Sequence, residues 1–209
     1  MTVSLSGPGL WYATRATGLV ALLLLTASVL LGVLTAGRFA SPRWPQFLTV
    51  GLHRSTALLA CVFLILHVGT TVLDSYTSVP LSAAFIPFLS AYKRVWLGLG
   101  AVALDLLLAL VVTSLTRGRL GYQGWRLVHW CGYGCWPVAV AHAVGAGTDE
   151  YTSWAVGLTI GCVTAVAAAV AWRLLRRWPE RRALRLSLVA VAVVVAVVPV
   201  ALSLGRYGR

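Results

Sequence analysis

Charged side chains are scarce in this sequence of 209 residues, because Asp, Glu, Lys and Arg together make up only 11% of it. Hydrophobic residues make up 59%, and the mean hydropathy is +0.87, which excludes an ordinary soluble globular protein. Most of the sequence falls into apolar runs long enough to cross a hydrocarbon core about 30 Å thick. We predict an all-α integral membrane protein, a single membrane domain over 1–209, with six transmembrane helices at about 13–36, 48–73, 95–116, 125–146, 154–175 and 184–204.

Room for a soluble nucleotide-binding domain is also lacking, because the predicted spans leave only short loops and termini. The string GLGAVA at 98–103 matches a dinucleotide-binding pattern, but it lies inside an apolar run with no strand before it. The first apolar run is too long for the core of a cleavable signal peptide, and no basic segment precedes it. We therefore expect the first run to be a permanent span.

Acidic residues are rarer than basic ones, five against 17, which gives a formal net charge of +12. The basic residues flank the spans instead of forming one soluble face, so nucleic acid is not a predicted partner. The positive-inside rule places loops one, three and five in the cytoplasm and both termini outside, in a cell membrane that we expect to be a bacterial plasma membrane. The fifth loop is basic enough to attract anionic lipid or an acidic donor protein, although topology alone explains its charge. The basic residues of these three loops are Arg38, Arg43, Arg54, Arg117, Arg119, Arg126, Arg173, Arg176, Arg177, Arg181, Arg182 and Arg185.

Four histidines are present, and all of them lie in two of the apolar runs. His53 and His67 are 14 residues apart, and His129 and His142 are 13 apart, which is roughly 20 Å along a helix at about 1.5 Å per residue. The second and fourth spans both enter from the cytoplasmic side, so His53 and His129 share an inner level while His67 and His142 share an outer level. Imidazoles from two sides are the axial ligands of b-type heme iron, so we predict two hemes between these spans. Other metal binding, a proton relay and plain packing remain open alternatives.

On a regular helix, His129 and His142 would not lie on the same face. Thirteen residues at about 100° each leave His142 roughly 140° from the face of His129 on a regular helix. We predict a kink or local rewinding between them, permitted by Gly132, Gly134 and Pro137. No C-x-x-C-H motif is present, so the predicted heme is bound without covalent attachment.

The two histidine pairs, with LHR at 52–54 and WRLVH at 125–129, resemble the ferric reductase-like transmembrane domain family. The family includes the membrane parts of ferric reductases and NADPH oxidases and the heme-binding membrane subunit of the bacterial methionine sulfoxide reductase system. The resemblance covers about 10–150, with the spans at about 154–175 and 184–204 as additions. It implies that His53 pairs with His129 on an inner heme and that His67 pairs with His142 on an outer heme.

Three arginines extend this resemblance. Arg15, in WYATRATG, resembles the family arginine near the outer heme propionates. Arg54 and Arg126 flank the inner histidines and suit the inner propionates through charge-assisted bonds, although cytoplasmic topology alone also explains them.

The resemblance implies transmembrane electron transfer by a ferric reductase-like oxidoreductase or by an electron-transfer subunit of one. Because the flavin- and nicotinamide-binding tail of the eukaryotic members is lacking, we expect electrons from a membrane quinol or a separate cytoplasmic flavoprotein. The expected acceptor is external: ferric iron, oxygen or a partner reductase. The alternative is a non-redox protein, such as a metal-ion transporter that uses the four histidines. A heme-bearing anchor subunit is a third interpretation.

Overall fold

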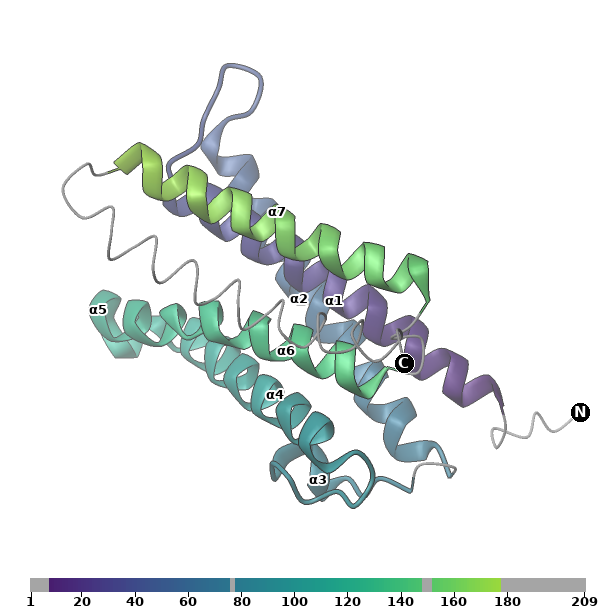
Figure 1. The fold of residues 1–209 in the computed structure, drawn as a ribbon. Coiled ribbons are helices and arrows are strands. Elements are labelled where there is room, and N and C mark those ends of the chain that lie inside the picture. The colour runs from purple at the N-terminus through teal and green to yellow at the C-terminus, as the bar shows by residue number, and fades with distance from the viewer. Residues whose placement is uncertain (1–7, 76–77, 148–151, 178–209) are drawn as a thin grey trace, which may run out of the picture. The chain divides into compact units, whose positions relative to one another are not determined.

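The computed structural model describes residues 8–75, 78–147 and 152–177, and these form helices joined by short loops (Figure 1). The described residues contain no β-strand beyond a single bridge between Ser41 and Trp44. The helices are α1 (Pro8–Ala36), α2 (Gln46–Leu73), α3 (Ser82–Phe85), α4 (Arg94–Leu115), α5 (Arg117–Trp130), α6 (Gly132–Ala146) and α7 (Ser153–Arg177).

Four of the predicted spans appear as long apolar helices. Among the described residues, Gly9–Ala36, Gln46–Leu73, Arg94–Leu115 and Ser153–Arg173 are long and apolar enough to cross a membrane. The span expected at 184–204 lies outside the described residues. The orientation with both termini outside stays a prediction.

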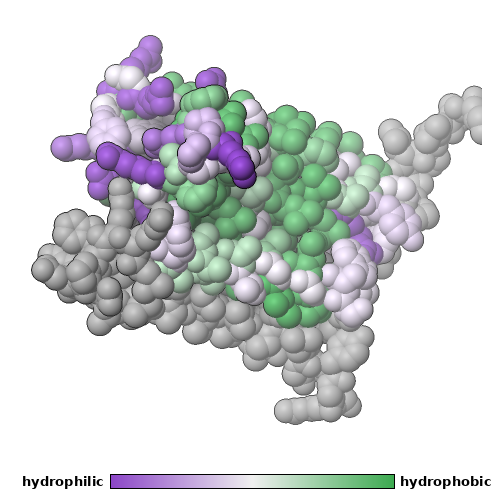
Figure 2. All heavy atoms as spheres, turned by 90° about the horizontal axis from the view of Figure 1, so that it is seen from above, coloured by the Kyte–Doolittle hydropathy of each residue, from purple (hydrophilic) through white to green (hydrophobic). Residues whose placement is uncertain are grey.

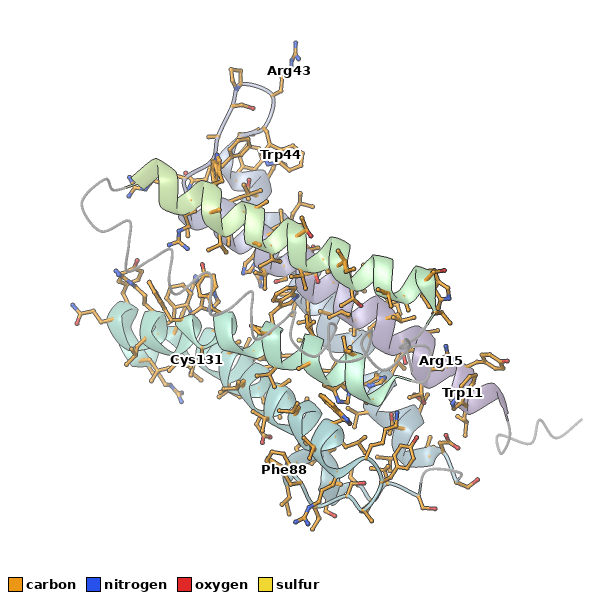
Figure 3. All side chains as sticks on the ribbon, in the orientation of Figure 1. Trp11, Arg15, Arg43, Trp44, Phe88 and Cys131 are labelled. Carbon is orange, nitrogen blue, oxygen red and sulfur yellow. The ribbon has the colours of Figure 1, made fainter. Side chains whose placement is uncertain are left out.

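The fourth expected span, 125–146, is not one helix. The structure divides it into α5 and α6, which meet at Cys131 (Figures 1 and 3). At this junction the N–H of Cys131 donates to the carbonyl of Val128 at 2.8 Å, and the N–H of Gly134 donates to the carbonyl of Cys131 at 2.9 Å. These bonds reach back three residues instead of four, so the backbone is wound more tightly here than in an α-helix.

A break between His129 and His142 is therefore present, as predicted, but not at all the expected residues. The junction lies directly before Gly132, while Pro137 lies inside α6 without ending it. A further irregularity comes earlier, at Gly121 in α5, whose φ of 70° and ψ of 165° are far from helical values. Only glycine adopts such a conformation without a steric penalty, so the helix beyond Gly121 changes direction there.

The chain forms two compact units, whose boundaries fall inside α1 and α2. Of the described residues, one unit comprises 8–19, 64–75 and 78–147, and the other comprises 20–63 and 152–177. In the first unit, α4 packs along α6 and also contacts α3 and α5. The segment 79–93, which contains Pro80 and Pro87, has only the one-turn helix α3.

Large apolar side chains are exposed on the surface, and Figure 2 shows broad hydrophobic areas on the face in view. Phe47 and Ile65 are each 72% exposed, and Leu115 is 79% exposed. Exposure of this kind is unfavourable in water and favourable against lipid tails, as the composition predicts.

Candidate functional site

His67, on α2, is held by the backbone of α1. Its Nδ1 lies 2.8 Å from the carbonyl oxygen of Thr14, one residue before Arg15. A carbonyl oxygen can only accept a hydrogen bond, so Nδ1 carries the proton and donates it. A neutral imidazole that donates from Nδ1 carries its lone pair on Nε2, which is then the nitrogen that can bind a metal.

His142, on α6, has the same arrangement against a different helix. Its Nδ1 donates to the carbonyl oxygen of Trp96 on α4 at 2.8 Å. Histidines that ligate metals usually donate their second ring N–H to a carbonyl or carboxylate, which fixes the tautomer and raises the basicity of the ligating nitrogen. The hydrogen bond to α4 therefore leaves the lone pair of His142 on Nε2.

The His67 and His142 rings approach each other. Their centroids are 6.2 Å apart, and the ring planes are inclined by 76°. A metal–imidazole bond is about 2.0 Å long and a ring centre lies about 1.1 Å from its nitrogen, so two imidazoles bound to opposite sides of one ion have centres about 6.3 Å apart. The observed separation fits axial ligation of a single iron by this pair.

His53 repeats the same bond near the other end of α2. Its Nδ1 lies 2.9 Å from the carbonyl oxygen of Ser28 and 3.4 Å from the hydroxyl oxygen of the same residue. Because the carbonyl accepts, Nδ1 is again the protonated nitrogen. In three of the four predicted ligands, Nδ1 thus donates to a backbone carbonyl, which lies on α1 for two of them and on α4 for the third.

His129 is oriented in another way. Its ring stacks on the indole of Trp125, one turn earlier in α5, with centroids 4.9 Å apart and planes inclined by 28°. The indole N–H of Trp125 in turn donates to the hydroxyl of Ser114 on α4 at 3.3 Å. His53 and His129 belong to different units, so their pairing stays a prediction.

The three predicted propionate partners lie on α1, α2 and α5. Arg15 is half-buried, and its guanidinium carbon lies 4.1 Å from the centre of the Trp11 ring (Figure 3). Arg15 directly follows Thr14, whose carbonyl accepts the hydrogen bond from His67. Arg54 directly follows His53 and Arg126 precedes His129 by three residues, and both are exposed. Their propionate roles stay predictions.

The described residues contain no group of three or more His, Cys, Asp or Glu side chains that could hold a metal ion. Among these residues His67 and His142 instead meet as a pair, and two imidazoles are the ligand set that the iron of a b-type heme takes. The GLGAVA string lies within α4, as expected for a segment of a membrane helix.

The family assignment follows from a comparison with protein-family models. The model described as ferric reductase like transmembrane component matches residues 17–140, which is more than half of the chain. The chain belongs to the ferric reductase-like transmembrane family. The earlier resemblance is thereby confirmed, and with four apolar helices the protein is a multi-pass membrane protein. Comparison with curated proteins and with solved structures gave no significant match.

Several residues that hold the histidines could not be predicted from the sequence. The carbonyls of Thr14, Ser28 and Trp96 belong to the backbone, which every residue has, so no side-chain pattern marks them. Trp125 does carry a signal, because it precedes His129 by four residues and so lies on the same helical face.

Membership of the family indicates membrane electron transfer as the general function.

Proposed function

We propose that this chain binds two noncovalent b-type hemes and transfers electrons across a membrane, from a quinol or a cytoplasmic flavoprotein to an external acceptor. The ligands in this proposal are His53 with His129 at the inner level and His67 with His142 at the outer level. The observation that carries the proposal is the His67–His142 pair: each ring donates its Nδ1–H to a backbone carbonyl, and the ring centroids lie 6.2 Å apart, the separation that ligation of one iron by both rings requires.

The protein's part in this function is positioning. Backbone carbonyls hold the Nδ1 protons of three histidines, so a neutral imidazole with its lone pair on Nε2 is ready before any metal arrives. Apolar helices keep water away from the ligands. A bound heme would supply reversible one-electron chemistry at its iron.

The donor side is proposed from charge. Arg117, Arg119 and Arg126 on α5 are exposed, and the positive-inside rule puts this loop in the cytoplasm. A basic surface of this kind attracts an acidic electron-donor protein and anionic lipid headgroups. The acceptor at the other side is ferric iron, oxygen or a partner reductase, and the protein acts as an oxidoreductase or as a subunit of one in a bacterial plasma membrane.

The test is the heme content of the full chain purified in detergent from heme-replete cells. We expect two hemes per chain with a low-spin, six-coordinate spectrum, fully released by acid acetone. Addition of a quinol or a reduced flavoprotein should reduce both hemes, and ferric chelate or oxygen should reoxidise them. A folded, helical preparation without heme would contradict the proposal.

A further inference from the structure

Glycines lie beneath three of the histidine rings, at matching places. His67 donates to the carbonyl of Thr14, and an added Cβ on Gly18 would lie 2.9 Å from its Nδ1. His142 donates to the carbonyl of Trp96, and a Cβ on Gly100 would lie 2.6 Å from its Nδ1. In both cases the glycine comes four residues after the acceptor carbonyl.

His53 shows the same relation with a looser fit. It donates to the carbonyl of Ser28, and a Cβ on Gly32, again four residues later, would lie 3.4 Å from Cε1 and 3.6 Å from Nδ1. We call each such pair, an acceptor carbonyl with the glycine four residues later, a carbonyl–glycine seat. The two seats on α1 are 14 residues apart, which is also the spacing of the two histidines on α2.

The geometry of an α-helix explains why glycine is needed there. The carbonyl of residue i accepts the N–H of residue i+4, and it keeps a second lone pair. The Cβ of residue i+4 tilts toward the N-terminus of the helix and covers the turn that contains this carbonyl. Glycine at i+4 leaves the carbonyl uncovered, so that an imidazole from another helix can reach its second lone pair.

The fourth histidine has a different counterpart on α4. His129 and His142 are 13 residues apart. The residues of α4 at the same separation from Trp96 and Gly100 are Ala109 and Thr113. Thr113 has a side chain where the seats have none, and its hydroxyl donates to the carbonyl of Ala109 at 2.6 Å. The structure thus provides three seats, and His129 is instead stacked on Trp125.

We propose that the carbonyl–glycine seats are positioning elements for heme ligation: they fix His53, His67 and His142 as Nδ1–H donors and thereby set the electron donation of Nε2 to iron. This inference rests on the proposed function. A stronger Nδ1–H bond gives the imidazole more negative character, which stabilises ferric over ferrous iron and lowers the midpoint potential. Displacing the ring from its seat should raise that potential and weaken heme binding.

The three seats predict a graded response to alanine. Gly100→Ala should act most strongly and Gly18→Ala next, because in both the new methyl group would overlap the ring, whereas Gly32→Ala requires a shift of only a few tenths of an ångström. For the first two we expect roughly 10- to 100-fold weaker heme binding, the usual effect of losing the hydrogen-bond acceptor that orients a ligating histidine. Gly32→Ala should keep both hemes and raise the potential of one of them slightly.

The controls are Gly69→Ala on α2 and Gly157→Ala on α7, where an added Cβ meets nothing within 4 Å. Alanine also has a higher helix propensity than glycine, so lost helix stability would not explain lost heme. The experiment measures heme content, midpoint potentials and low-spin EPR spectra of the five variants and of the wild type.

The seats are supported if Gly18→Ala and Gly100→Ala change the same heme while the controls match the wild type. They are refuted if a heme-replete wild type and all three seat variants share the same potentials and spectra, or if the controls shift as much as the seat variants. Gly32→Ala decides the matter if the other two variants fail to fold. A folded wild type without heme would instead refute the proposed function itself, and the seats with it.

Discussion

Trp125 offers a quantitative test of how His129 is positioned. Its indole stacks on the imidazole with centroids 4.9 Å apart, and aromatic pairs of this kind contribute about 0.5–1.5 kcal/mol beyond their buried area. Trp125→Leu keeps an apolar side chain of good helix propensity but removes the stack. If this energy holds the ring in its ligating orientation, the heme bound by His129 should dissociate roughly 2- to 12-fold more readily.

Two further variants separate the stack from the hydrogen bond. Ser114→Ala removes only the acceptor of the 3.3 Å bond from the Trp125 indole, which we expect to cost about 0.5 kcal/mol, so its effect should be the smaller one. Trp130→Leu is the matched control, because Trp130 lies on the same helix, is 55% exposed and packs against Tyr133.

The assay is a titration of heme-depleted protein with heme, followed by absorbance, alongside thermal unfolding to verify the fold. Unchanged heme affinity in Trp125→Leu, or an equal loss in Trp130→Leu, would show that the stack does not position His129.

Two other predictions concern α6, one at its C-terminal end and one inside it. The Lys93 ammonium donates to the carbonyls of Gly145, Ala146 and Gly147 at 3.3, 3.4 and 3.4 Å, where the dipole of α6 is negative. Lys93→Met should therefore lower the free energy of unfolding by about 0.5–1 kcal/mol. An unchanged unfolding midpoint in detergent would contradict this. Pro137→Ala should leave heme occupancy unchanged, because the break between His129 and His142 lies at Cys131 and Pro137 does not end α6. A loss of heme with the fold intact would show that the proline is needed to position His142.

The long apolar helices could be predicted from the sequence because hydropathy and length decide them. The first expected span, 13–36, lies within α1, and the third, 95–116, agrees with α4 to within one residue at each end. The fourth span could not be bounded in this way. Its composition is mostly apolar apart from Arg126 and the two histidines, but the break at Cys131 depends on local hydrogen bonds that hydropathy does not register. The need for a break was nevertheless visible in the 13-residue spacing, which does not match the helical repeat.

The candidate ligands were evident from the sequence because histidine is rare and costly in apolar helices. What holds them was hidden, since a backbone carbonyl has no signature in the sequence. The glycines did leave a partial trace: Gly18 and Gly32 repeat the 14-residue spacing of His53 and His67. Gly100 gave no such signal, because the residue 13 positions further along α4 is Thr113, so no second glycine repeats the spacing of His129 and His142.

The central claim is that His67 and His142 ligate one heme and that His53 and His129 ligate the other. The most direct measurement is the redox titration of the four single His→Ala variants, each compared with the two-heme wild type. We predict that His67→Ala and His142→Ala lose the same component, and that His53→Ala and His129→Ala both retain it while losing the other. Loss of the same component in His53→Ala and His142→Ala would contradict the account.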